Sequence, residues 1–310
     1  MFGDALASDL ELPDLARALA ADPPRWTVTV ADGAPPPADA KLIGARQLGP
    51  EAYTLWRMSD GFRLEYSHAG VFDITDSGSR IVWYRRADAI PELVRAIVLG
   101  PALALALELA GLFCLHGSAV RLGDTAMAFV GPKHHGKSTL ATALTAAGAR
   151  LIGDDLVAIS PGPPAIVRPG VASVRLWADA VAAVGIDRLP ARVIPGLKAT
   201  VTDFADASRA TEDTLLSDIY VLAPVSASGR GGSEPPCWRT ALPRGAAAVV
   251  LAQQTKLAAT LVGIHAAGTQ LRVAARIAES VRVWTLSVAR DLSRLPAIVD
   301  VLRGWNREAA

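Results

Sequence analysis

The stretch Gly131-Pro-Lys-His-His-Gly-Lys-Ser-Thr139 decides how the rest of the chain is interpreted. It fits the pattern G-x-x-x-x-G-K-[ST], in which the backbone N–H groups of a loop surround phosphate groups. A hydrophobic run at 126–130 leads into the loop, and the helix-compatible run STLATALTAAG follows it and ends at Gly148. Strand, loop and helix in this order turn the positive end of the helix toward the phosphates. The stretch therefore predicts a nucleotide-binding loop in an α/β fold.

Each residue of this loop is a candidate for nucleotide binding. Lys137 is expected to reach the β- and γ-phosphates, and the hydroxyl of Ser138 is expected to bind Mg²⁺. Two histidines stand where such loops often carry small residues. Histidine tolerates a left-handed backbone better than most non-glycine residues, and a protonated ring would add donors; alternatively, both rings face solvent. The loop candidates are Gly131, Pro132, Lys133, His134, His135, Gly136, Lys137, Ser138 and Thr139.

Two adjacent acids follow the next predicted strand. The run Arg150-Leu-Ile-Gly-Asp-Asp155 begins as a strand over 150–153. Ligands of α/β sheets bind at the carboxyl ends of strands, so Asp154 and Asp155 are expected beside the phosphate loop. One carboxylate can hold Mg²⁺ while the other accepts a proton from an attacking hydroxyl. The alternative is that the pair only ends a strand.

Counting residues along a predicted hairpin brings His116 to the same place. Strand-like runs at 113–121 and 125–130 flank a turn at Leu122-Gly-Asp124. A hairpin centred on Gly123 pairs His116 with Val130, next to the first glycine of the loop. Although a lone histidine on a strand is more often structural, this register predicts that His116 orients a carboxylate or exchanges a proton.

The pattern along the chain predicts two domains. Up to about residue 95, short alternating runs separated by glycine-containing turns indicate a strand-rich module, 1–95. Residues 96–310 are expected to form an α/β domain with a mixed sheet flanked by helices. The expected strands are 26–30, 61–66, 70–74, 80–84, 113–121, 125–130, 150–153, 216–222 and 281–287; the expected helices are 101–112, 137–148, 177–184, 244–262, 268–279 and 291–305; the expected surface loop is 226–236.

Composition narrows the class of protein. The 310 residues carry a net charge of +1, so no overall field attracts nucleic acid or an anionic membrane. Two cysteines are too few for a disulfide framework or metal cluster and favour a reducing cytosol. The N-terminus has acids where a signal peptide needs bases. The apolar run at 96–115 is interrupted by Pro101 and Glu108, which predicts a buried helix and not a membrane span.

Three motifs together resemble a known family. They are His116-x-Ser-Ala-Val120, the phosphate loop, and Gly148-Ala-Arg-Leu-Ile-Gly-Asp-Asp155. This set resembles the catalytic domain of HPr kinase/phosphorylase, and more closely the HPr-kinase-like proteins found beside lasso-peptide biosynthesis enzymes. The latter are similar in their strand-rich front and in a P-G-x-x-x-[LV]-R-L-W stretch, here Pro169 to Trp177. The resemblance implies ATP- and Mg²⁺-dependent phosphorylation of a peptide serine, with the C-terminal serine of a lasso-type precursor as the expected acceptor.

The resemblance also implies roles for single residues. It implies that His116 supports the catalytic carboxylate, that Asp154 is the base, and that Asp155 belongs with Ser138 to the metal environment. Arg175 and Lys198 are further cationic candidates for contact with phosphate or acceptor, with simple surface solvation as the alternative. The sequence departs from the family where Ser173 replaces a glutamate that helps hold the metal. The reverse, phosphorolytic reaction therefore lacks one of its expected groups.

Two other functions fit the same motifs. A small-molecule kinase of the shikimate-kinase type also places an aspartate strand after its phosphate-loop helix, but it needs neither the long front nor the histidine hairpin. A non-catalytic ATP-binding partner in a biosynthetic cluster would bind nucleotide without using the paired acids. We expect a peptide or protein partner, no nucleic acid and no membrane. The bacterial relatives form rings, but the sequence does not fix an oligomeric state.

Overall fold

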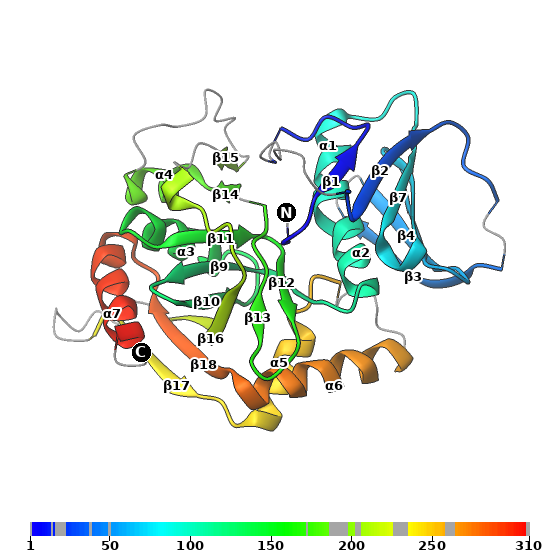
Figure 1. The fold of residues 1–310 in the computed structure, drawn as a ribbon. Coiled ribbons are helices and arrows are strands. Elements are labelled where there is room, and N and C mark those ends of the chain that lie inside the picture. The colour runs from blue at the N-terminus through cyan, green and yellow to red at the C-terminus, as the bar shows by residue number, and fades with distance from the viewer. Residues whose placement is uncertain are drawn as a thin grey trace.

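The computed structural model describes residues 2–13, 15, 23–36, 39–48, 51–171, 173–185, 198–201, 206–225, 235–257 and 264–307. Two large sheets dominate it, one of seven strands within residues 6–84 and one of nine strands within residues 113–289. Figure 1 shows the seven-stranded sheet on the right, the nine-stranded sheet on the left, and the helices α1 and α2 between them. The chain is a mixed α/β protein, as the sequence predicted.

The seven-stranded sheet has the order β1-β2-β7-β6-β5-β4-β3. The strands β3 to β7 pair with one another in antiparallel fashion. Strand β2 pairs in parallel with both β1 and β7. The four predicted strands of this region are confirmed, and three more were not predicted because their alternation is weak. The strands are β1 (Leu6–Ser8), β2 (Trp26–Ala31), β3 (Lys41–Leu48), β4 (Glu51–Arg57), β5 (Phe62–Tyr66), β6 (Gly70–Thr75) and β7 (Arg80–Tyr84).

A continuous helical segment covers one face of this sheet. It consists of α1 (Pro91–Ile97), the π-helical turn η2 (Val98–Ala102) and α2 (Leu103–Leu109). The predicted helix is confirmed but starts at Pro91, a residue well suited to a first helical turn. Pro101 has no N–H to donate, and the segment accommodates it in the π-helical turn. No helix in the described part of the chain is long and apolar enough to cross a membrane.

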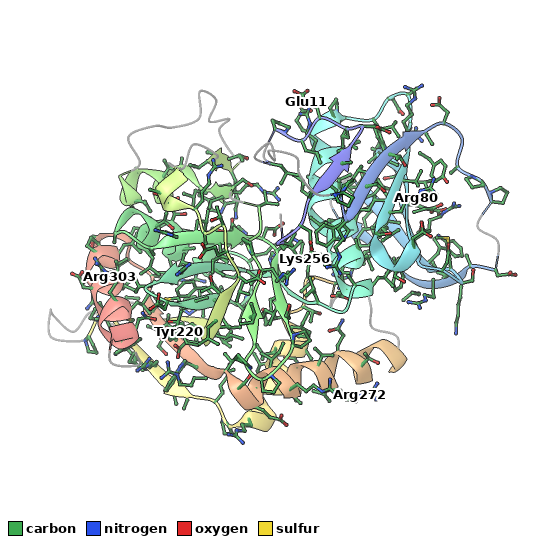
Figure 2. The ribbon with its side chains drawn as sticks, viewed as in Figure 1. Glu11, Arg80, Tyr220, Lys256, Arg272 and Arg303 are labelled. Atoms are coloured by element: carbon green, nitrogen blue, oxygen red, sulfur yellow. The ribbon has the colours of Figure 1, made fainter. Side chains whose placement is uncertain are left out.

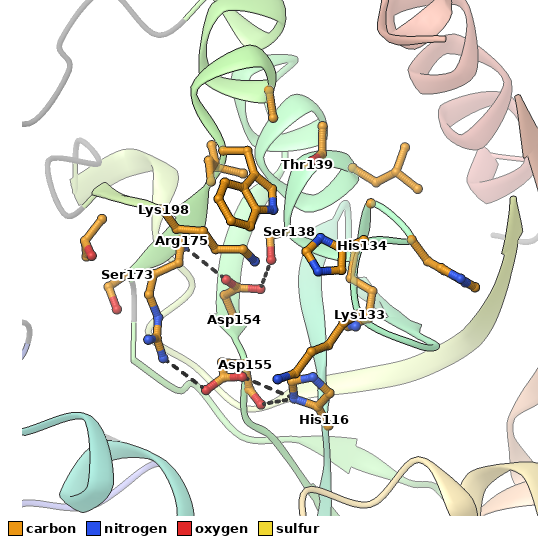
Figure 3. A pocket seen from close by; sticks show the side chains of 18 of the residues that line it. His116, Lys133, His134, Ser138, Thr139, Asp154, Asp155, Ser173, Arg175 and Lys198 are labelled. Carbon is orange, nitrogen blue, oxygen red and sulfur yellow. Dashed lines mark hydrogen bonds and ion pairs between the residues drawn. The ribbon is translucent and has the colours of Figure 1, made fainter. Parts of the chain in front are cut away.

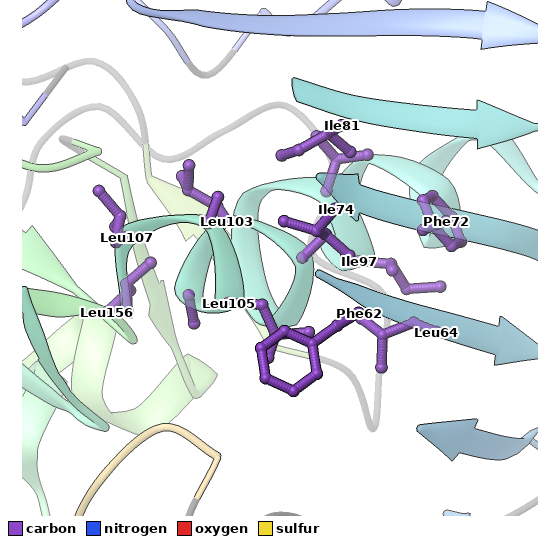
Figure 4. Packing of buried hydrophobic residues seen from close by; sticks show 14 of the residues in the cluster. Phe62, Leu64, Phe72, Ile74, Ile81, Ile97, Leu103, Leu105, Leu107 and Leu156 are labelled. Carbon is purple, nitrogen blue, oxygen red and sulfur yellow. The ribbon is translucent and has the colours of Figure 1, made fainter. Parts of the chain in front are cut away.

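The helical segment shares one apolar core with the sheet. Side chains of the segment pack against sheet residues, as Figure 4 shows. The expected domain boundary between residues 95 and 96 falls inside α1, so the division into two domains stays a prediction. The labelled members of this core are Phe62, Leu64, Phe72, Ile74, Ile81, Ile97, Leu103, Leu105, Leu107 and Leu156.

The nine-stranded sheet supports the predicted phosphate loop. Its central path is β11-β9-β10-β16-β13-β12-β8, and β18 pairs with both β16 and β17. Because β10, β16 and β18 run in parallel, their carboxyl ends meet at one edge. The strands are β8 (Phe113–Leu115), β9 (Gly117–Leu122), β10 (Thr125–Val130), β11 (Arg150–Asp154), β12 (Val157–Ser160), β13 (Ile166–Val167), β16 (Thr214–Val225), β17 (Cys237–Ala241) and β18 (Arg282–Ala289).

Helices cover both faces of this sheet. One apolar cluster joins a face of the sheet to α3 (Lys137–Ala146), α4 (Ala178–Val184) and α7 (Leu295–Arg307). A second cluster joins the other face to α5 (Arg244–Gln253) and α6 (Ile264–Ser280). The small sheet of β14 (Val174–Leu176) and β15 (Ala199–Val201) lies next to α3. Of the predicted surface loop 226–236, residues 226–234 lie outside the described part of the chain.

The register of the β9–β10 hairpin differs from the prediction by one residue. Val130 pairs with Gly117, and Thr125 pairs with Leu122. The turn is a two-residue turn, in which Gly123 has φ +63°, so the hairpin is not centred on a single residue. His116 consequently lies outside this ladder, at the break between β8 and β9, and the predicted single strand over 113–121 is two strands.

Candidate functional site

The phosphate loop has the backbone geometry that the motif requires. Gly131 and Gly136 have φ of +137° and +90°, and His134 takes the left-handed conformation with φ +65°. No side chain caps the N-terminus of α3, so its first N–H groups remain for a ligand. An anion is the ligand that such a helix end favours.

Lys137 is folded back onto the loop. Its Nζ donates to the carbonyl oxygens of Gly131 (2.7 Å) and Pro132 (3.1 Å). Burial lowers the pKa of Lys137, against the opposing effect of the Asp154 charge. A buried ammonium that contacts two carbonyl oxygens is well suited to bind an incoming phosphate.

The two loop histidines have different surroundings. Nδ1 of His135 lies 3.2 Å from the carbonyl oxygen of Leu222 on β16. The exposed ring of His134 stacks on Trp177, with ring centroids 5.7 Å apart. Nζ of Lys198 lies 5.8 Å from the centre of the same tryptophan ring. Trp177 therefore links two sequence-predicted residues at the rim of the site.

Asp154 is hydrogen-bonded to Ser138 of the phosphate-loop motif and to Ser118 on β9. Its Oδ1 accepts hydrogen bonds from Ser138 (2.9 Å) and Ser118 (2.5 Å). Its Oδ2 accepts from the backbone N–H of Arg175 at 3.3 Å. Burial raises the pKa of Asp154, although the hydroxyl donors act in the opposite direction. Figure 3 shows Asp154 directly beside Ser138.

Asp155 has a different set of partners. Its Oδ1 lies 3.1 Å from Nδ1 of His116, and its Oδ2 lies 2.6 Å from Nζ of Lys256 and 3.4 Å from Nη2 of Arg175. Burial by itself would raise its pKa, but the Lys256 charge and the His116 hydrogen bond hold the pKa well below its usual range. Three basic side chains thus surround one ionised carboxylate, as Figure 3 shows for two of them.

Lys256 is the functional candidate that the sequence did not reveal. It follows α5, where the predicted helix over 244–262 ends early at Gln253. The segment pairs with β8 instead: His116 N–H donates to Gln254 and Lys256 N–H donates to Cys114, both at 2.8 Å. Figure 2 shows Lys256 near the middle of the molecule. No motif contains this lysine, so only tertiary structure could have identified it.

Two buried leucines, which follow Asp155 and Lys256 in the sequence, pack in the N-terminal core. Leu156 follows Asp155 and Leu257 follows Lys256, and both are buried in the cluster that contains the seven-stranded sheet and α2. The backbone at Asp155 takes a positive φ of +69°. The core of the first 110 residues therefore helps to fix the site, although no motif residue lies in it.

One large cavity of about 1320 Å³ brings these residues together. Most sequence-predicted site residues line it; Gly131 and Pro132 do not, and take part through the carbonyl groups that Lys137 contacts. Among the described residues, no group of three or more His, Cys, Asp or Glu side chains is arranged to hold a metal. The predicted residues that line it are His116, Lys133, His134, His135, Gly136, Lys137, Ser138, Thr139, Asp154, Asp155, Arg175 and Lys198.

Comparisons with known proteins add a distant likeness to solved structures. No protein-family model matches the chain, and no curated protein matches it. Among solved structures, the Hpr(Ser) kinase/phosphatase from Coxiella burnetii aligns with 63% of this chain and 98% of its own, at 11% sequence identity and a TM-score of 0.32. A TM-score this low leaves the functional question to the side chains of the site.

Proposed function

We propose that the chain is an ATP-dependent kinase, with an HPr-kinase-like catalytic domain, that transfers the γ-phosphoryl group to a hydroxyl. The observation that carries the proposal is the meeting of a phosphate loop with two acids in unlike environments at one cavity. A serine of a peptide, such as a lasso-type precursor, is the acceptor suggested by the motif resemblance. Lys137, the loop N–H groups and the N-terminus of α3 bind the nucleotide phosphates in this proposal.

The donor set beside the loop fits Mg²⁺. This ion binds oxygen ligands and commonly uses one or two protein groups together with water and substrate phosphates. Ser138 and Asp154 already share a hydrogen bond of 2.9 Å, so both oxygens face the same position. Bound Mg²⁺ would neutralise charge on the phosphate oxygens. We therefore assign Asp154 to the metal, which reverses the division of roles that the family resemblance implies.

Asp155 is then the group that meets the acceptor hydroxyl. It stays ionised because Lys256, His116 and Arg175 contact its carboxylate. Its chief task is to orient the hydroxyl, since phosphoryl transfer proceeds through a loose transition state in which positioning matters most. His116 and Lys256 act through Asp155, and they are positioning residues.

A transfer assay tests the proposal. The protein is incubated with Mg²⁺ and ATP, and either serine-containing peptides or small polyols, and the products are weighed by mass spectrometry. We expect one phosphate on a peptide serine. Phosphorylated polyol and unmodified peptide would indicate a small-molecule kinase. Nucleotide binding without any transfer would indicate a non-catalytic ATP-binding protein, and absence of nucleotide binding would reject the whole proposal.

A further inference from the structure

The cavity is larger than one ligand requires. Its volume of about 1320 Å³ exceeds the roughly 300–1,000 Å³ of pockets that hold one small molecule. The phosphate loop, the end of β18 and the start of α7 line one part of it. Residues of α1 and η2 also line the cavity, and they belong to none of the nucleotide-binding motifs. The cavity thus has room for a second substrate beside the nucleotide.

Five residues of α1 and η2 form a single face toward the cavity. They are spaced at i, i+3, i+4, i+7 and i+8, the positions that share one side of a helix. Residues between them, Val94, Ile97 and Val98, point the other way and are buried in the core. We call the cavity-facing set the helical stripe; its members are Glu92, Arg95, Ala96, Leu99 and Gly100.

The helical stripe and Asp155 are joined through the same core. Leu156, the residue after Asp155, packs in the cluster that contains Ile97 and Val98 from the opposite side of the helical segment. Figure 4 shows Leu156 beside Leu107 in this cluster. Asp155, Leu156 and the helical stripe all line the one cavity. The stripe therefore lines the same cavity as the carboxylate assigned to the acceptor.

The helical stripe is apolar over one part of its length and polar over the other. Ala96, Leu99 and Gly100 supply an apolar surface that is partly or fully buried, whereas Glu92 is exposed at the rim. Arg95 is held in place, because its Nε donates to the carbonyl oxygen of Glu11 at 3.0 Å. Such a wall suits a chain that is apolar near the reaction centre and polar farther out.

We propose that the helical stripe binds the phosphoryl acceptor, a peptide segment with an apolar residue next to its reactive hydroxyl. This inference rests on the proposed kinase function. The apolar side chain lies against Ala96, Leu99 and Gly100, and the polar peptide groups meet Glu92 and Arg95. The hydroxyl then reaches Asp155, opposite the phosphates on the loop.

Gly100 offers a specific way to block this wall. A Cβ added there meets no atom within 4 Å, so a larger side chain extends into free space. Gly245 in α5 is a matched control, because its Cβ position is equally open and it does not line the cavity. Neither glycine has a positive φ, so leucine is compatible with both backbones.

The experiment compares Gly100→Leu and Gly245→Leu with the unchanged protein. Two probe peptides differ only before the serine, with leucine in one and aspartate in the other, and transfer from ATP is followed. We expect kcat/KM for the leucine peptide to exceed that for the aspartate peptide about tenfold. Gly100→Leu is expected to raise KM for the leucine peptide about tenfold or more, with KM for ATP unchanged, and Gly245→Leu to change neither.

A second variant tests the same wall if Gly100→Leu does not fold. Ala96→Asp places a charge on the apolar part of the helical stripe and is expected to raise the same KM; melting curves of all variants report folding. Equal kcat/KM for the two peptides, or unchanged peptide KM in both stripe variants, would overturn the acceptor wall and leave the kinase proposal standing. A rise in KM for ATP would assign this wall to the nucleotide. Absence of ATP binding in the unchanged protein would reject the kinase proposal itself.

Discussion

On one wall of the cavity, the phosphate loop and the paired acids lie within 23 residues of each other in the sequence, from Lys133 to Asp155. On the other wall, the residues come from 92–100 and from Lys256, far apart along the chain. The first wall is encoded in contiguous motifs, and the second exists only after the two sheets pack against the helical segment. The groups proposed to carry out the chemistry are therefore close together in the sequence, whereas their orientation in the folded protein depends on the N-terminal core.

The largest expected effect concerns the seven-stranded sheet, on the face opposite to the one that packs against the helical segment. Arg63 and Asp73 form a buried two-point ion pair between β5 and β6, at 2.6 and 2.7 Å. Arg63→Met leaves a buried carboxylate uncompensated and is expected to lower the free energy of unfolding by about 3–5 kcal/mol. Urea denaturation measures this change.

The matched control is the similar two-point pair of Arg85 and Asp32, which is well exposed. Arg85→Met is expected to leave the free energy of unfolding almost unchanged, because water screens an exposed ion pair. Equal losses in the two variants would mean that burial of the Arg63–Asp73 pair does not raise the stability cost of removing its arginine.

A large effect on phosphoryl transfer is expected at Lys137 in the phosphate loop. Lys137→Met removes the ammonium that contacts the loop carbonyls and is expected to lower kcat for transfer about 10²–10³-fold, with weaker ATP binding. Steady-state kinetics and calorimetric titration with ATP measure the two effects. Lys41→Met, an exposed lysine on β3, is the control. Unchanged transfer in Lys137→Met would contradict the proposed role of the phosphate loop in phosphoryl transfer.

A smaller effect is expected at Lys256, the residue of the second wall that contacts Asp155. Lys256→Met removes the 2.6 Å ion pair with Asp155 but leaves His116 and Arg175 in contact, so kcat should fall about 10–100-fold through misorientation of the carboxylate. KM for ATP is expected to stay constant, and Lys256→Arg should restore much of kcat. A purely structural role would instead lower stability and both kinetic parameters, without rescue by arginine.

The smallest effect is a pH dependence of stability at Glu108, on α2. Burial raises its pKa from 4.5 to about 8, and Gln270 donates to its Oε2 at 3.1 Å. The folded state favours the protonated carboxyl, so its stabilising contribution is complete below pH 4.5 and is lost as pH rises toward 8. Because Glu108 is only partly buried by surface area, we expect a loss of about 1 kcal/mol.

Glu108→Gln should abolish this loss, and melting temperatures between pH 5 and pH 8 measure it. Glu279→Gln, an exposed glutamate on α6, should leave the pH dependence as it is. A parallel pH dependence in Glu108→Gln and the unchanged protein would contradict the assignment.

Much of the wall formed by the phosphate loop and the paired acids could be predicted, because its parts are close in sequence. The strand, loop and helix from β10 to α3 and the position of β11 follow from periodicity and glycine placement alone. The hairpin register was wrong by one residue, because a two-residue turn and a single-residue turn produce the same sequence signals around Gly123. His116 nevertheless contacts Asp155, since the break between β8 and β9 frees its side chain from the ladder.

The second wall was not predictable for a physical reason. Lys256 stands in a run that favours helix over 244–262, and only hydrogen bonds with β8 end that helix at Gln253. The start of the helical segment at Pro91 was missed because Pro101 suggested a boundary, whereas a π-helical turn accommodates it. Tertiary contacts override local propensity at the end of α5, whereas a local change of helix type accommodates Pro101.

Asp155, and not Asp154, is proposed to meet the acceptor hydroxyl, and the two isosteric variants distinguish these carboxylates. ATP affinity and transfer to a serine peptide are measured for Asp155→Asn and Asp154→Asn across Mg²⁺ concentrations. We expect Asp155→Asn to bind Mg²⁺ and ATP normally and to lose transfer about 10²–10⁴-fold, while Asp154→Asn requires more Mg²⁺. Retained transfer in Asp155→Asn, or an increased Mg²⁺ requirement in that variant alone, would contradict the account.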